Sequence, residues 1–206
     1  KVRDRNADFQ PAGVEWVKDM VAGFDPAANT VVTAGGQRIP YDFLAGATGV
    51  QLDFAQIEGM DAGAIGSNGL TSVYPSPQAA QATWAAMQAF TAKGGNCVMT
   101  LPATPLKCAG APLKMSFMLR DRLMKAGTLG SSKISFQSAL GNVFGVKVVN
   151  DNVLERWKAL GIDVEFSRKL AAIDIGARRA TFVSPEGEKQ EMPYDFIHVV
   201  PPMRAP

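Results

Sequence analysis

The sequence predicts an α/β fold, in which a parallel sheet is followed by a β-meander, together with a β-rich part of a second domain of the same design. Two observations predict this fold class. A pattern of strand, meander and closing apolar strand occurs twice, at residues 13–44 and at residues 161–197. Between the two copies, apolar strands alternate with helical segments, and such alternation is typical of a parallel sheet.

Length and composition indicate a globular protein. The 206 residues give room for one ordinary domain and part of another. Hydrophobic residues make up 47% and charged residues 19% of the chain, and the net charge is only +2. The charges are interspersed, so nucleic acid is not an expected partner, and no apolar run is long enough to span a bilayer. Because the start is charged and lacks Met, we expect a piece of a longer chain.

The first copy of the repeat begins with GVEWV at residues 13–17 and ends with PYDFL at residues 40–44. Turns are predicted at residues 25–29 and at Gly35-Gly36, because clusters of Pro, Gly and Asn between β-rich runs mark hairpins. We expect a meander and then a closing strand. Residues 1–66 are therefore assigned to a partial domain.

The stretch after residue 66 is predicted to alternate helices and strands. Pro112 marks a first helical turn, and Gly127 and Gly161 mark helix ends. The expected elements are a helix at 77–93, a strand at 96–101, a helix at 112–125, a strand at 133–136, a helix at 150–160 and a strand around Val164. This order predicts a complete Rossmann-like domain at residues 67–200, with residues 201–206 returning to the first domain.

The first strand–helix turn of this domain is unusual. In dinucleotide-binding domains this turn carries G-x-G-x-x-G, whose glycines admit the pyrophosphate to the helix N-terminus. Here residues 102–112 read PATPLKCAGAP, without that fingerprint and with Cys108 four residues before Pro112. We expect that nicotinamide binding has been lost and that a thiol occupies the site.

Cys108 is placed where a thiolate is favoured. The thiolate is the reactive species in sulfur chemistry, and helix amides and nearby cations stabilise it. Lys107 is adjacent, and Lys114 lies in the first turn of the predicted helix. On this chemistry alone, a functional thiol and an inert, half-buried loop thiol are both open interpretations.

A family resemblance appears at this turn. Residues 104–114, TPLKCAGAPLK, resemble the T-P-x-K-C-A-G-A-P-x-K signature of sulfide:quinone oxidoreductases. Similar stretches lie at residues 13–16 (GVEW), 41–44 (YDFL), 141–146 (GNVFGV) and 198–203 (HVVPPM). The resemblance covers nearly the whole chain and favours a functional role for Cys108.

The resemblance implies an FAD-dependent enzyme that oxidises sulfide at a cysteine pair and passes the electrons through the flavin to quinone. Cys108 matches the first cysteine of the pair, and the second is expected outside this chain. The implied FAD contacts are Val21 and the strand end Ala47, Thr48 and Gly49, although Val21 also fits a core position and Ala-Thr-Gly is a common strand end. The first domain would be the FAD-binding one.

The resemblance also implies a parent protein bound peripherally to a membrane, which we expect to be a bacterial inner membrane. We expect the 206-residue piece alone to be inactive, because the family's N-terminal G-x-G-x-x-G and C-terminal flavin motif are missing. Three alternatives stay open: a sulfide dehydrogenase that reduces a cytochrome, a type II NADH:quinone oxidoreductase, which would need the missing glycines, and a sulfur-carrier or interaction module without flavin.

The other candidate residues are expected to be structural. Cys97, in mid-strand, is predicted to be a packed thiol. His198 is the only histidine, and we expect a buried imidazole with its hydrogen bonds satisfied. No spacing of Cys, His and Asp predicts a metal site.

Overall fold

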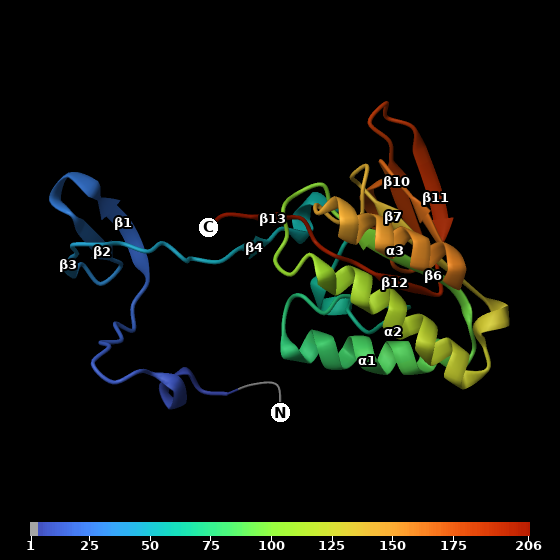
Figure 1. The fold of residues 1–206 in the computed structure, drawn as a ribbon, viewed down its shortest axis with the longest axis horizontal. Coiled ribbons are helices and arrows are strands. Elements are labelled where there is room, and N and C mark those ends of the chain that lie inside the picture. The colour runs from blue at the N-terminus through green and yellow to red at the C-terminus, as the bar shows by residue number, and fades with distance from the viewer. Residues whose placement is uncertain (1–3) are drawn as a thin grey trace. The chain divides into compact units, whose positions relative to one another are not determined.

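The computed structural model describes residues 4–206, and the chain divides into two compact units, Lys1–Thr48 and Gly49–Pro206. Unit 1 contains a short 3-10 helix, Asn6–Phe9, and an antiparallel meander (Figure 1). The meander consists of β1 (Val21–Asp25), β2 (Thr30–Thr33) and β3 (Arg38–Pro40). The meander expected within residues 13–44 is therefore confirmed. The opening strand expected at residues 13–17 is not formed, because the described chain has no strand before β1.

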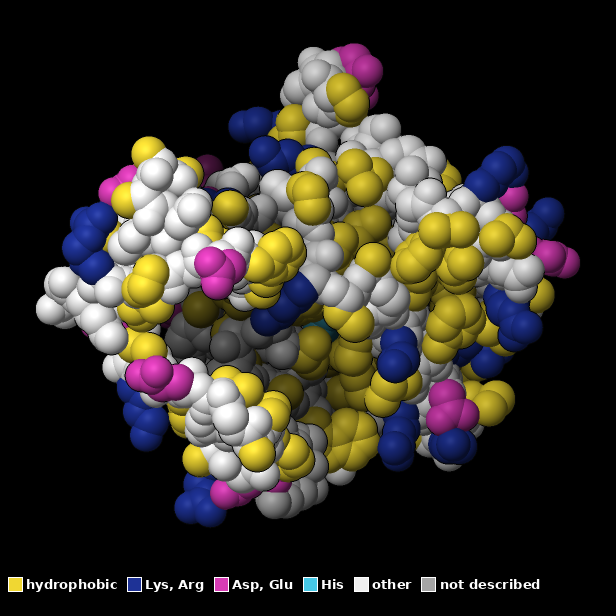
Figure 2. Space-filling model, turned by 60° about the vertical axis from the view of Figure 1, so that its left-hand side comes forward, with side chains coloured by type: hydrophobic (Ala, Val, Ile, Leu, Met, Phe, Trp, Pro, Cys, Tyr) yellow, Lys and Arg dark blue, Asp and Glu magenta, His cyan; other side chains and the backbone are white. Residues whose placement is uncertain are grey.

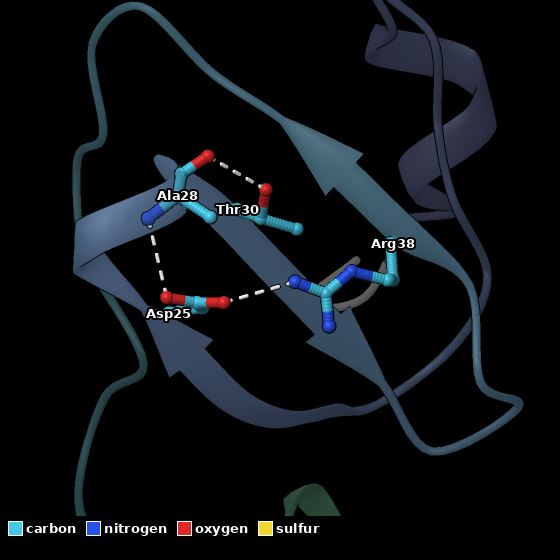
Figure 3. Close-up of polar contacts among 4 residues, drawn as sticks. All are labelled: Asp25, Ala28, Thr30 and Arg38. Carbon is cyan, nitrogen blue, oxygen red and sulfur yellow. Dashed lines mark hydrogen bonds and ion pairs between the residues drawn. The ribbon is translucent and has the colours of Figure 1, made fainter.

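The first turn of this meander is held by side chains, as Figure 3 shows. The Asp25 carboxylate accepts a hydrogen bond from the Ala28 backbone N–H at 3.2 Å, and Arg38 Nη2 forms an ion pair with it at 3.0 Å. The Thr30 hydroxyl donates to the Ala28 carbonyl at 2.9 Å. Asn29 takes a left-handed conformation with φ +46°, which Asn tolerates better than most residues. The turn predicted at residues 25–29 thus has a local cause.

The closing strand expected at residues 40–44 is not formed. β3 ends at Pro40, and the chain from 41 to 50 is irregular. A strand needs a neighbour to take up its backbone hydrogen bonds, and the described strands of unit 1 pair only with one another. The Phe43 side chain is 88% exposed. The local apolar pattern was therefore insufficient to specify a strand here.

Unit 2 contains a five-stranded sheet in the order β5-β12-β6-β7-β8, and all four pairings are parallel. The strands are β5 (Leu70–Thr71), β6 (Gly95–Leu101), β7 (Ser132–Ser138), β8 (Ile162–Glu165) and β12 (Phe196–His198). The connecting helices are α1 (Pro77–Thr91), α2 (Gly110–Ala126) and α3 (Lys147–Leu160). This Rossmann-like parallel sheet confirms the predicted fold class.

The remaining strands of unit 2 are antiparallel. β9 (Lys169–Asp174), β10 (Arg179–Val183) and β11 (Lys189–Pro193) form the second meander, and β4 (Gln51–Leu52) pairs with β13 (Met203–Arg204). Single 3-10 turns lie at Phe54–Gln56, Ala62–Ala64 and Leu129–Ser131. Residues 49–66 pack with this unit, because Ile57 lies in its core and Glu58 bridges to Ala172.

The central sheet is covered on both faces. In β6, Cys97, Met99 and Leu101 join the core cluster that also contains α2 and α3 residues. Val98, between them, joins the cluster that contains residues of β9 and β10. This alternation is the period of two expected of a strand. Helices therefore cover one face of the sheet, and the second meander covers the other.

The helix ends follow the predicted signals. α2 and α3 end at Gly127 and Gly161, whose φ angles of +75° and +70° are in the left-handed region that glycine adopts readily. The start of α1 at Pro77 agrees with the prediction, but α2 and α3 begin earlier than expected. Asn150, the first residue of the helix predicted at 150–160, instead accepts a hydrogen bond from the Val143 N–H at 2.9 Å, and α3 begins at Lys147.

Candidate functional site

The loop of residues 102–109, here called the cysteine loop, follows the carboxyl end of β6. β6 lies between β12 and β7, near the middle of the sheet. Ligands of open parallel sheets bind beyond the carboxyl ends of the strands. The structure thus places Cys108 at the edge of the sheet where chemistry is expected.

Contacts with the end of the chain hold the cysteine loop. The Met203 N–H donates to the Thr104 hydroxyl at 2.9 Å, and the Lys107 N–H donates to Met203 Sδ at 3.3 Å. Leu106 packs against the core cluster of Tyr74, Val200 and Met203. The loop is fixed by segments about a hundred residues away in sequence.

Cys108 adopts an uncommon backbone conformation. Its φ is +57°, in the left-handed region that costs a non-glycine residue about 1 kcal/mol. Its carbonyl accepts a hydrogen bond from the Ala111 N–H at 2.9 Å, and Ala109 is the N-cap of α2. The helix begins at Gly110, two residues before the expected Pro112, so the thiol lies closer to the helix N-terminus than predicted.

The two cysteines differ sharply in accessibility. Both are free thiols; Cys108 is exposed, whereas Cys97 is 1% exposed. Burial raises the pKa of the Cys97 thiol well above its usual value. The prediction that Cys97 is a packed thiol is therefore confirmed, and Cys108 is the thiol that a soluble reagent can reach.

An open pocket of about 400 Å³ adjoins the cysteine loop. Leu106 and Met203 give it apolar walls, and Lys107 and Arg204 add positive charge, that of Arg204 being partly offset by Asp53 at 3.8 Å. Such a pocket suits a small anion that is also partly hydrophobic. On the face drawn in Figure 2, by contrast, basic side chains are interspersed with acidic ones.

Two buried polar side chains lie behind the loop. Tyr74 is 8% exposed, and burial, with the negative charge at Cys108 as a smaller cause, raises its pKa to about 12. His198 is 1% exposed, and burial lowers its pKa to about 4. His198 is buried as predicted, but its ring nitrogens have no hydrogen-bond partner among the described residues, so no described protein group satisfies the imidazole as expected. Tyr74 was not predicted as a site residue, because nothing in TSVY at residues 71–74 signals burial by a segment distant in sequence.

The residues assigned to FAD are all exposed. Val21 begins β1 opposite Thr33, and Ala47, Thr48 and Gly49 lie in the irregular segment, not at a strand end as expected. Val21, Ala47 and Thr48 belong to unit 1, whereas Gly49 begins the unit that contains Cys108. The described residues contain no group of three or more His, Cys, Asp or Glu able to hold a metal ion.

Comparison with known proteins identifies relatives. No protein-family model matches the chain. The mitochondrial sulfide:quinone oxidoreductase of Mus musculus is 37% identical over 202 residues, which is 95% of this chain and 43% of the mouse protein. By sequence, this chain is a relative of the sulfide:quinone oxidoreductases. The mitochondrial sulfide:quinone oxidoreductase of Dictyostelium discoideum is 36% identical over 197 residues, covering 95% of this chain and 42% of that protein.

The fold of this sulfide:quinone oxidoreductase relative agrees with the sequence comparison. The X-ray structure of the sulfide:quinone oxidoreductase from Aquifex aeolicus superimposes with a TM-score of 0.73 at 25% identity, covering 93% of this chain and 43% of that one. The chain thus spans less than half the length of these relatives. The mitochondrial names contradict the bacterial inner membrane that we expected. Within the described residues, no helix is both long and apolar enough to cross a membrane.

Proposed function

We propose that this chain is the part of an FAD-dependent sulfide:quinone oxidoreductase that carries one cysteine of the catalytic pair, Cys108. The observation that carries the proposal is the exposed Cys108 thiol, which lies at the carboxyl end of β6 on a loop held by hydrogen bonds. The chain that contains it is 37% identical to a protein named sulfide:quinone oxidoreductase. The names of the relatives do not favour a sulfide dehydrogenase or a carrier module without flavin.

The proposed chemistry needs a reactive thiol and a route for two electrons. Hydrosulfide bonds to one sulfur of an oxidised cysteine pair, the disulfide bond breaks, and the other cysteine leaves as a thiolate. The sulfur atom of the hydrosulfide is oxidised, and the pair gains two electrons, which end on quinone. In this chain, Cys108 supplies one sulfur. Lys107 and Arg204 favour an approaching hydrosulfide anion and a thiolate by their positive charge.

Val21, Ala47, Thr48 and Gly49 are proposed to contact FAD, which would accept the electrons from the cysteine pair. Their exposure fits this role, since the backbone at Ala47 to Gly49 is not covered by a strand partner within unit 1 or unit 2. Gly49, with φ +76°, has no atom within 4 Å of the position where a Cβ would stand, so a flat ring system has room to approach. The cysteine loop lacks the glycines of a pyrophosphate cradle.

The domain assignment follows from the same proposal. Residues 1–66 would belong to the FAD domain, residues 67–200 to the second domain, and residues 201–206 to the return of the chain. In this assignment residues 49–66 belong to the FAD domain although they pack with unit 2. Peripheral binding of the full-length protein to a membrane would give access to the quinone.

The test is Cys108→Ser in the full-length protein that contains this chain. Serine nearly preserves the volume, but its hydroxyl cannot carry sulfur, so sulfide-dependent reduction of a soluble quinone analogue should fall at least about a hundredfold. Bound flavin should be unchanged. Cys97→Ala is the matched control, because this buried thiol should be dispensable for turnover. A Cys108→Ser protein that keeps more than about a tenth of the rate would refute the proposal.

A further inference from the structure

At the carboxyl ends of β5 and β12, three buried side chains carry polar atoms without a hydrogen-bond partner among the described residues. These atoms are the Ser72 hydroxyl, the Tyr74 hydroxyl and both ring nitrogens of His198. All three residues are less than a tenth exposed. Buried polar groups are normally hydrogen-bonded, so unpaired ones call for an explanation, and a catalytic role is one such explanation.

Strand pairing brings these residues together. In the parallel pair of β12 and β5, His198 stands opposite Thr71, and Ser72 and Tyr74 follow directly along the chain. The ring centroids of Tyr74 and His198 are 6.3 Å apart, with the planes inclined at 47°. The two rings therefore lie next to each other at the carboxyl edge of the sheet.

Tyr74 also lies close to the cysteine loop. It packs in one core cluster with Leu106 and Ala111, which flank Cys108 along the chain on either side. Burial is the larger cause of the raised pKa of Tyr74, and a negative charge at Cys108 is the smaller one. The Tyr74 hydroxyl has no hydrogen-bond partner among the described residues, so its O–H is free to donate.

The protonation states of Tyr74 and His198 determine which atoms can donate hydrogen bonds and which can accept them. With a pKa of about 12, Tyr74 is neutral near pH 7 and has one O–H to donate. With a pKa of about 4, His198 is also neutral and has one N–H to donate. The other charged groups on the segments around the cluster are Lys107, Lys114, Arg204 and Asp53, the last two joined by an ion pair at 3.8 Å.

We propose that Tyr74 is a positioning residue for the Cys108 sulfur: its hydroxyl donates a hydrogen bond to that sulfur in the anionic form, and the His198 N–H donates to the Tyr74 oxygen. The inference deepens the proposed function and rests on Cys108 being its reactive thiol. Tyr74 and His198 would thus stabilise a negative charge on the Cys108 sulfur from the buried side of the loop, which faces away from solvent.

The experiment measures the rate of alkylation of Cys108 by iodoacetamide between pH 6 and pH 10, in the full-length protein with Tyr74→Phe. We expect loss of the Tyr74 hydroxyl to lower the thiolate population of Cys108 about tenfold. The alkylation rate falls by less than this, because a less stabilised thiolate is more nucleophilic. The rate at pH 7 should therefore fall about threefold, whereas the rate at pH 10 should equal or exceed that of the wild type. A purely structural role would not produce this crossover.

Tyr194→Phe is the matched control. Tyr194 is also buried, its hydroxyl also lacks a partner in the described residues, and burial raises its pKa to about 12 as well. It belongs to the core cluster on the meander face of the sheet. Its replacement should leave the alkylation profile of Cys108 unchanged, with melting temperatures recorded for both variants.

A second pair of variants keeps the test decisive if Tyr74→Phe fails to fold. His198→Leu removes the donor and should lower the rate at pH 7, whereas the similarly sized His198→Asn offers an N–H and should restore most of it. A Tyr74→Phe or His198→Leu profile that superimposes on the wild type, or a Tyr194→Phe profile shifted equally, overturns the inference. Because alkylation needs no turnover, a protein that shows the crossover without oxidising sulfide would contradict the proposed function alone.

Discussion

The two thiols of this chain allow a direct test of the fold and the site together. We expect iodoacetamide to label Cys108 far faster than Cys97 in the native chain at neutral pH. Cys97 lies in β6 and is paired on one side with Phe196 of β12 and on the other with Ile134 of β7. Its exposure therefore requires the centre of the five-stranded sheet to open.

The magnitude follows from that requirement. Opening of a central strand costs nearly the full free energy of unfolding, and even about 5 kcal/mol corresponds to an open fraction below about one in a thousand. The raised pKa of Cys97 slows the reaction further. We expect a ratio of rates of at least about a thousand, read by peptide mass mapping over time. In strong denaturant the two rates should converge. Native labelling of Cys97 within tenfold of Cys108 would show that β6 is not the buried centre of the sheet.

Three further predictions concern stability and the cofactor. Gly69→Ala should lower the free energy of unfolding in urea by about 3 kcal/mol or more, because φ is +75° and the new Cβ would stand 2.2 Å from the Asp195 carbonyl oxygen. Gly127→Ala is the control, because Gly127 has the same φ but open space around it, and it should cost only about 1 kcal/mol. His198, with its pKa lowered by burial from 6.5 to about 4, stays neutral when folded while the unfolded chain takes up a proton. The free energy of unfolding should therefore fall by roughly 3 kcal/mol as the pH drops from about 6.5 to about 4. If a His198→Asn protein lost the same stability over this pH range, His198 would not be the cause. Finally, the 206-residue chain dialysed against FAD should retain far less than one equivalent by absorption, and an equimolar flavin band would show that the four exposed contact residues carry more affinity than we assign to them.

Those parts of the fold that have local causes could be predicted from the sequence. The ends of α2 and α3 follow from Gly127 and Gly161, since a glycine in the left-handed conformation commonly ends a helix. The turn at residues 25–29 follows from the Asp and Asn side chains within it. The alternation of helices and strands also appears in the sequence as a local pattern of apolar residues. This pattern was enough to predict the parallel sheet.

Features that depend on distant partners could not be predicted in the same way. The segment at residues 40–44 has the composition of a strand, but the described part of unit 1 offers it no neighbour. The burial of Tyr74 depends on Val200 and Met203, more than a hundred residues later. The unpaired ring nitrogens of His198 likewise depend on β12 lying between β5 and β6, which no local pattern encodes.

The two family-like motifs, TPLKCAGAPLK and HVVPPM, form one structural unit although they lie far apart in sequence. The Val200 N–H donates to the Thr100 hydroxyl at 3.0 Å, just before the cysteine loop, and Met203 contacts both Thr104 and Lys107 within it. A residue with φ +57° is retained only where its surroundings over-determine the backbone, and these contacts provide that constraint. The second motif is therefore needed to hold the thiol in place, and a change at Met203 should act on Cys108 without touching it.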